Sequence, residues 1–153
     1  MNEVKEDLPW LLRKVVLPQN TDHAGVMWHG SYLLWLEEAR ISALLGVGLA
    51  YKELSDEGFE MPVVDLTIKY MLPLLHGENV VLKSWISRGK GARWQWETNF
   101  VKDSNDIAAL ANVDLVLIEK KDSGNRLLRS GPDYIANALV ELQKGSSLKI
   151  NEY

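Results

Sequence analysis

The chain contains no cysteine among its 153 residues. This absence excludes disulfide bonds, a thiolate nucleophile, and zinc or iron–sulfur sites that depend on cysteine ligands. A chain without disulfides suits the reducing cytoplasm, where we expect this one to reside. Any chemistry that the chain performs must therefore use other side chains.

An excess of positive charge and long apolar runs are also missing. The sequence has 17 basic and 21 acidic side chains, a formal net charge of -4, so it has no overall field that attracts nucleic acid or an anionic membrane. The longest apolar run, residues 41–51, is interrupted by serine and glycine and is shorter than the roughly 20 residues of a membrane span. The first ten residues are acidic rather than basic and then apolar, so we expect no export signal.

What the chain does have is enough apolar material for a core. A hydrophobic fraction of 46% and six tryptophans in 153 residues favour one folded domain, which we expect to span residues 1–153. The apolar periodicity and the turn residues predict strands over 11–17, 64–70, 80–86, 93–100 and 107–119, and helices over 29–46, 51–57 and 132–144.

This order of elements predicts an α+β domain, in which a long helix lies against a curved five-stranded antiparallel sheet and a short C-terminal helix follows. The apolar stripe of the long helix is broad, so we expect that helix to be mostly buried. One helix does not cover both faces of such a sheet, and the sheet edges need partners. The sequence therefore predicts a dimer.

A polar stretch, NTDHAGVMWHGSY over residues 20–32, precedes the long helix and is the first candidate site. Asp22 taken alone is a common turn former. However, Gly25 lets the backbone approach a ligand closely, and a helix beginning near His29 directs free N–H groups and a positive dipole end into the same volume. A carboxylate beside such donors is typical of acyl transfer, because the donors stabilise the oxyanion.

The same stretch carries a family resemblance. Asp22 to Tyr32, followed by Trp35-Leu36-Glu37 and Arg40, resembles the signature of the hot-dog thioesterases of the 4-hydroxybenzoyl-CoA thioesterase and tol-pal-associated acyl-CoA thioesterase type. The similarity continues more loosely to about residue 119. It implies a hot-dog fold, a homodimer or homotetramer, and active sites at the dimer interface.

The resemblance also implies roles for individual residues. Asp22 would be the catalytic nucleophile or general base, and the backbone N–H of His29 would polarise the thioester carbonyl, while the role of the His29 side chain stays open. Family members often carry a second acid where this chain has Asn20. We assign Gly25, Met27, Trp28 and Tyr32 to substrate binding. The histidine spacing matches no standard zinc pattern, so we expect neither a metal nor a separate cofactor.

Residues 87–93, SRGKGAR, form the second candidate site. One interpretation is a flexible hairpin with solvated charges. The other is a pocket for the phosphates of coenzyme A, formed by Arg88, Lys90 and Arg93, because arginine suits bidentate phosphate contacts. We favour the second interpretation, which the resemblance also implies.

The leading hypothesis is an acyl-CoA thioesterase acting on a small aromatic or a short to medium acyl group. A non-catalytic acyl-CoA-binding module is one alternative, since the same fold can serve both purposes. A hot-dog hydratase or dehydratase is a second, weaker one. The Asp22 carboxylate separates the first two, because a binding module does not need a nucleophile or base at the thioester.

Overall fold

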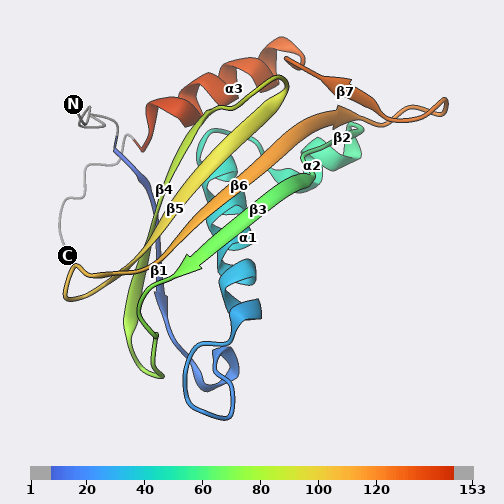
Figure 1. The fold of residues 1–153 in the computed structure, drawn as a ribbon. Coiled ribbons are helices and arrows are strands. Elements are labelled where there is room, and N and C mark those ends of the chain that lie inside the picture. The colour runs from blue at the N-terminus through green and yellow to red at the C-terminus, as the bar shows by residue number, and fades with distance from the viewer. Residues whose placement is uncertain (1–7, 147–153) are drawn as a thin grey trace.

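The structure is a computed structural model that describes residues 8–146. A strongly curved antiparallel sheet wraps one long helix (Figure 1). The elements in chain order are β1 (Trp10–Val15), η1 (Pro18–Asn20), α1 (His29–Gly46), α2 (Tyr51–Asp56), β2 (Phe59–Glu60), β3 (Val63–Tyr70), β4 (Asn79–Arg88), β5 (Arg93–Lys102), β6 (Ile107–Glu119), β7 (Arg126–Leu128) and α3 (Asp133–Lys144).

The sheet joins its long strands in the order β1-β4-β5-β6-β3, with every pair antiparallel. Alternate residues of β4, β5 and β6 point inward and are buried, as the period-two pattern predicts. Ser84 of β4 and Thr98 of β5 lie opposite one another on this inner face and share a hydrogen bond of 2.8 Å. The short strands β2 and β7 pair with β6 and were not predicted, because two or three residues show no periodicity.

Helix α1 begins at His29, as the sequence predicts. One side of the helix packs against the sheet. Its buried stripe includes Tyr32, Trp35 and Leu36 in the first two turns. The helix ends at Gly46, and Gly48 then takes a φ of +84°, a left-handed conformation that glycine adopts without steric cost.

The prediction that α1 is mostly buried is wrong for the single chain. Leu33, Leu34 and Leu45 widen the apolar stripe in the sequence, but they are 44%, 61% and 62% exposed. The reason is that the sheet covers only one side of the helix. Their exposure leaves an apolar strip along α1 that nothing in residues 8–146 covers.

Strand β3 is the second exposed apolar feature. It pairs with β6 on one side and lies at the edge of the sheet on the other, and almost every residue along it is exposed. The strand carries Val64 at 46% and Leu66 at 37% exposure. An edge with unpaired backbone groups and apolar side chains is a surface that proteins usually cover.

The C-terminal helix α3 closes one end of the core. Ile135, Leu139 and Leu142 are almost fully buried, and the indole N–H of Trp10 donates to the Leu142 carbonyl at 2.9 Å. This helix follows Pro132, as the sequence predicts. Within residues 8–146, no helix combines the length and apolar content needed to cross a bilayer.

Candidate functional site

Asp22 lies in a tight loop between η1 and α1. The Asp22 N–H donates to the Val26 carbonyl at 2.9 Å, and the Gly25 N–H donates to the Asp22 carbonyl at 3.0 Å. Gly25 has a φ of +80°, which the turn requires and which glycine permits. Thr21 forms an antiparallel bridge with Met27, so the loop returns alongside itself immediately before the helix.

The two carboxylate oxygens of Asp22 have different surroundings. Oδ1 accepts the Ala24 N–H at 2.8 Å, which is the local bond of a turn-forming aspartate. Oδ2 has no hydrogen-bond or ion-pair partner among residues 8–146. The turn therefore orients the carboxylate through one oxygen and leaves the other available for chemistry.

The N-terminus of α1 is held open beside this carboxylate. Trp28 is the N-cap residue and makes no side-chain cap bond, and the N–H groups of His29 and Gly30 find no acceptor in the described part of the chain. The Asn20 carbonyl accepts both the Trp28 N–H at 2.8 Å and the Ser31 hydroxyl at 2.9 Å. These bonds fix the helix start against the loop while its first donors stay free.

The side chain of Asn20 takes part in the same local structure. Its Oδ1 accepts the Leu17 N–H at 2.9 Å and stabilises the η1 turn. A carboxylate oxygen at this position would accept the same bond, and the amide oxygen of Asn20 accepts it here. The departure from the family pattern at this position therefore leaves the backbone hydrogen bond intact.

A pocket of about 410 Å³ opens in front of the Asp22 loop and the helix start. Its wall combines three of the predicted substrate residues, Met27, Trp28 and Tyr32, with the end of β3 and the segment that follows β3. Gly25, which we also assigned to substrate binding, lies in the Asp22 loop but is not among the lining residues. The lining residues are Asp22, Val26, Met27, Trp28, His29, Tyr32, Tyr70, Met71, Leu72 and Pro73.

Tyr32 forms the floor of the pocket and is only 3% exposed. Its ring meets Tyr70 edge-on, with centroids 5.0 Å apart, and packs at a tilt against Phe100. Burial, and to a smaller extent the neighbouring Tyr70, raises the pKa of Tyr32 to about 12. The phenol is therefore neutral at physiological pH.

Trp28 and His29 form the outer rim. Their rings are 4.9 Å apart at an angle of 53°, and the Trp28 side chain is 47% exposed. The indole lies over Gly30, where a Cβ would approach Trp28 Cζ3 to 2.1 Å. Trp35, which belongs to the family motif, is buried in the core at 3% exposure and does not line the pocket.

Sequence reasoning missed the wall contributed by Tyr70, Met71, Leu72 and Pro73. Tyr70 continues the inward-facing alternation of Leu66 and Ile68, which register with Val113 and Ala111 of β6. That alternation would have allowed the inward direction of the Tyr70 side chain to be predicted from the sequence. Nothing local in the sequence shows that the next three residues turn toward the Asp22 loop.

The basic residues of the second candidate site lie at the other end of the sheet. The Arg88 guanidinium stacks over Trp94 at 4.4 Å and donates to the Arg129 carbonyl at 2.7 Å, while Lys90 is exposed in the β4–β5 turn. Arg93 lies on the outer face, because it alternates with the buried Trp94, and its guanidinium contacts Asp114 at 3.0 Å and Asp65 at 3.8 Å. The structure therefore does not group Arg93 with Arg88.

The two candidate sites are separated by the length of β3. Tyr70, at one end of the strand, lines the Asp22 pocket, whereas Val63, at the other end, pairs with Leu115, which pairs in turn with Trp94 beside Arg88. Seven residue steps in a strand cover about 23 Å. Figure 1 shows the loop before α1 and the β4–β5 turn at opposite ends of the molecule.

Nothing in the described residues gathers a metal-binding set. Within residues 8–146, no group of three histidine, aspartate or glutamate side chains could hold an ion. His23 and His76 are exposed. The chemistry available at the pocket is that of one carboxylate, two free backbone donors and an aromatic wall.

The chain is similar to proteins of a known family. Residues 16–141 match the sequence profile of the thioesterase-like superfamily. YneP of Bacillus subtilis (strain 168), a provisionally named acyl-CoA thioesterase, is 28% identical over 101 residues, which cover 66% of this chain and 73% of that protein.

Two solved structures share the architecture. The DHNA-CoA thioesterase from Staphylococcus aureus is 25% identical with a TM-score of 0.75, covering 87% of this chain and 89% of that one. A 1,4-dihydroxy-2-naphthoyl-CoA thioesterase from Synechocystis is 22% identical with a TM-score of 0.76, covering 87% of this chain and 96% of that one. The hot-dog fold that the sequence implied is thereby confirmed.

Proposed function

Because this chain belongs to the thioesterase-like superfamily and is a thioester hydrolase, we propose that it cleaves an acyl-CoA thioester in the pocket beside Asp22. One observation carries the proposal. Asp22, whose Oδ2 is free, and His29, whose N–H is free, line the same pocket, which places both residues beside one bound thioester. A carboxylate and an oxyanion donor are the minimum that thioester hydrolysis needs.

In the proposed reaction, the carbonyl oxygen of the thioester accepts a hydrogen bond from the His29 N–H. Asp22 Oδ2 then either attacks the carbonyl carbon or removes a proton from a water molecule that attacks it. In the first route, the C–S bond breaks, coenzyme A leaves as a thiolate that takes a proton from water, and a second water hydrolyses the acyl–aspartyl anhydride. In the second, water adds directly and the C–S bond breaks from the tetrahedral intermediate.

The acyl group that we propose is a small aromatic or a short to medium chain. The support is the volume of about 410 Å³ and a wall of Trp28, Tyr32, Tyr70 and Met71. Rings of this kind bind flat aromatic groups by stacking and edge contacts. The Staphylococcus aureus neighbour is a DHNA-CoA thioesterase, which favours an aromatic acyl group here.

We further propose that two chains pair along β3 to form a homodimer, which is able to pair again into a tetramer. Antiparallel pairing of two β3 strands would cover the exposed edge and the apolar strip of α1. It would also place the Val63 end of one strand beside the Tyr70 end of the other. Arg88 and Lys90 of one chain would then lie near the Asp22 pocket of its partner, where they would bind the phosphates of coenzyme A.

The experiment that tests the function is thiol release from a panel of aromatic, short-chain and long-chain acyl-CoAs. Asp22→Ala should lower turnover by roughly 10²- to 10⁴-fold, the usual contribution of a catalytic base, with an unchanged circular dichroism spectrum. His23→Ala, one residue away and exposed, is the control and should keep full activity.

An Asp22→Ala enzyme that turns over at the normal rate would contradict the assigned role. Tight binding without turnover by the wild-type chain, across the whole panel, would instead establish the acyl-CoA-binding module. Hydration of an unsaturated acyl-CoA without thiol release would establish the hydratase.

A further inference from the structure

The Asp22 loop is held in place by a segment that follows β3. The Met27 N–H donates to the Leu74 carbonyl at 2.7 Å, and Val26 forms an antiparallel bridge with Leu75. On its other side, Val26 accepts the Asp22 N–H. Three short extended pieces therefore lie side by side, with Asp22 on the first and Leu75 on the third.

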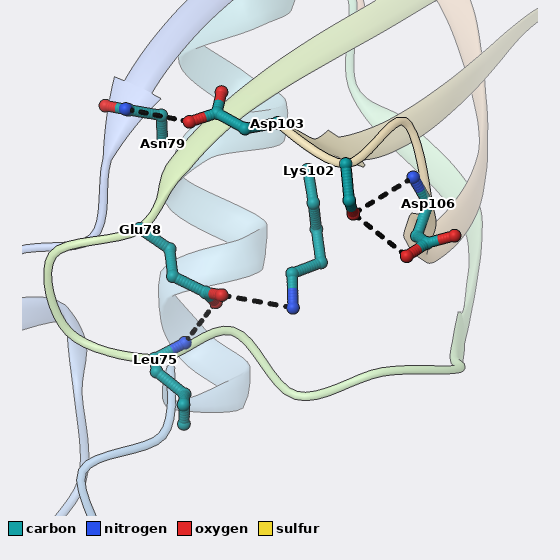
Figure 2. A network of polar contacts seen from close by, with 7 residues as sticks. Leu75, Glu78, Asn79, Lys102, Asp103 and Asp106 are labelled. Carbon is teal, nitrogen blue, oxygen red and sulfur yellow. Dashed lines mark hydrogen bonds and ion pairs between the residues drawn. The ribbon is translucent and has the colours of Figure 1, made fainter.

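Glu78 fixes the third piece through its side chain. As Figure 2 shows, one carboxylate oxygen accepts the Leu75 N–H at 2.8 Å, and the other lies 3.1 Å from the ammonium of Lys102 at the end of β5. The Glu78 N–H also donates to the Leu75 carbonyl, which closes a turn over residues 75–78. Gly77 takes a φ of +88° within this turn.

The backbone of the same turn is anchored to β1. The Val16 N–H donates to the Glu78 carbonyl at 2.9 Å, and the Gly77 N–H donates to the Val16 carbonyl at 2.8 Å. Val16 is fully buried, so this end of the turn is attached to the core. Within residues 8–146, the Leu75 end is held by its bridge to Val26, by the bonds to Glu78 and by the preceding Leu74, whose side chain is buried and whose carbonyl accepts the Met27 N–H.

The surroundings keep the Glu78 carboxyl ionised. The hydrogen bond from the Leu75 N–H, reinforced by Lys102, holds the pKa of Glu78 below its usual value despite partial burial and the nearby Asp103. Both partners of the ion pair are partly buried, with 22% of the Lys102 and 30% of the Glu78 side chain exposed. An ionised acceptor makes a stronger bond to a backbone N–H than a neutral one.

We infer that Glu78 is a positioning residue for the proposed thioesterase reaction. Within residues 8–146, the polar partners of its carboxylate are Leu75 and Lys102, and neither residue lines the pocket. By holding the Leu75 N–H, it fixes Val26 and Met27, and through them the separation between the Asp22 carboxylate and the His29 N–H. The reaction depends on that separation, because a misplacement of about 1 Å can lower a rate by about 10²-fold.

The two bonds of Glu78 make different contributions. The ion pair with Lys102 is partly solvated, and pairs of that kind contribute little. The bond to Leu75 acts directly on the segment beside the Asp22 loop. The hydrogen bond, rather than the charge, therefore sets the position.

Three variants separate these contributions. Glu78→Gln keeps an oxygen acceptor for Leu75 and loses the ion pair. Glu78→Ala loses both. The charge swap Glu78→Lys with Lys102→Glu restores an ion pair but leaves no acceptor. Glu38→Gln is the matched control, because Glu38 pairs with Lys14 at 3.0 Å with similar lysine exposure, 27%, and lies away from the loop.

The kinetic arm rests on the proposed function. Glu78→Ala and the charge swap should lower kcat by about tenfold or more with KM nearly unchanged, whereas Glu78→Gln should stay within about threefold of the wild type. Glu38→Gln should leave kcat unchanged. Recovery of kcat in the charge swap would overturn the assignment to the hydrogen bond.

A second arm is independent of catalysis. Amide hydrogen exchange at Met27 and Leu75 should accelerate by about tenfold or more in Glu78→Ala and in the charge swap, and not in Glu38→Gln. Unchanged exchange at both amides would overturn the positioning role, whatever the enzyme does. Faster exchange in a chain whose wild type hydrolyses no acyl-CoA would sustain the positioning role and reject the proposed function.

Discussion

At the scale of single residues, the site depends more on backbone groups than on side chains. Asp22 contributes one oxygen to the pocket, and the other is used by its own turn. The oxyanion donor that we propose is the main-chain N–H of His29, the first residue of α1, which lines the same pocket. The imidazole of His29 lies on the rim against Trp28.

The backbone donor can be removed without ending the helix. His29→Pro deletes the N–H at the first helical position, where proline is well tolerated. Trp28 already has φ -71° and ψ 142°, the extended conformation that a residue before proline needs. We expect thiol release to fall by about 10²- to 10³-fold, the usual cost of losing one oxyanion donor.

His29→Ala is the companion variant, because it removes the imidazole and keeps the N–H. It should retain most of the activity, and helicity by circular dichroism should match the wild type in both variants. The reverse ranking, with alanine inactive and proline active, would assign the role to the side chain instead.

Because the pKa of Tyr32 is raised, we expect the folded protein to lose stability at alkaline pH. Its pKa, about 12 in the folded chain against 10.0 for a free phenol, is raised, so folding favours the protonated form. The stabilisation is complete below pH 10 and is lost as the pH rises toward 12. Urea unfolding should show a wild-type free energy that falls over this range more steeply than that of Tyr32→Phe. Equal slopes would show that burial of Tyr32 is not coupled to its ionisation.

At the scale of elements, long periodic segments were predictable and the meeting of distant segments was not. The strand over 107–119 was predicted with the bounds that β6 has, because alternation over thirteen residues is unambiguous. Asp22 and His29 were chosen from local chemistry and from a motif. The opposite wall of the pocket depends on how the chain after β3 folds back. The hydrophobic periodicity of the sequence carries no information on that.

The in–out alternation of side chains along β5 would have shown from the sequence that Arg93 does not share a site with Arg88. Arg93 precedes the buried Trp94, so its side chain points to the outer face, where it meets Asp114. The three basic residues were grouped by their nearness in sequence. In a strand, neighbours lie on opposite faces, and nearness in sequence does not imply a shared site.

The hydroxyl pair inside the sheet gives a prediction at this scale. Thr98→Val leaves the Ser84 hydroxyl, only 1% exposed, without its partner, and should lower the free energy of unfolding by about 1–3 kcal/mol. The double variant Ser84→Ala with Thr98→Val removes both polar groups. Denaturant unfolding should therefore show a cost for the double variant that is smaller than the sum of the two single ones. Strict additivity would mean that the two hydroxyls do not interact.

At the scale of the whole molecule, a single chain leaves part of its apolar surface exposed to solvent. The strip along α1 exposes leucine, and the edge of β3 exposes both valine and leucine. The proposed dimer would cover both features. It would also unite two groups of residues that a single chain keeps about 23 Å apart along one strand.

A shared site can be tested by mixing two defective chains. One carries Asp22→Ala, and the other carries Arg88→Glu with Lys90→Glu. Each alone should release little thiol at low acyl-CoA concentration. After unfolding and refolding together, half of the dimers should be mixed and hold one intact site of two, so about a quarter of the wild-type activity should return. No recovery, with dimers present by light scattering, would place both groups of residues within one chain.

The hydrogen bond between the Ser84 and Thr98 hydroxyls also helps to determine the register between β4 and β5. The side chains beside this pair on the inner face of β4 and β5 are apolar, so their contacts require no particular hydrogen-bond partner. A slip between β4 and β5 would move each hydroxyl to an apolar neighbour and bury two unbonded polar groups. A misaligned sheet is therefore less stable than the native one, and the hydroxyl pair favours the register in which Phe100, two residues along β5, packs against Tyr32 of the pocket.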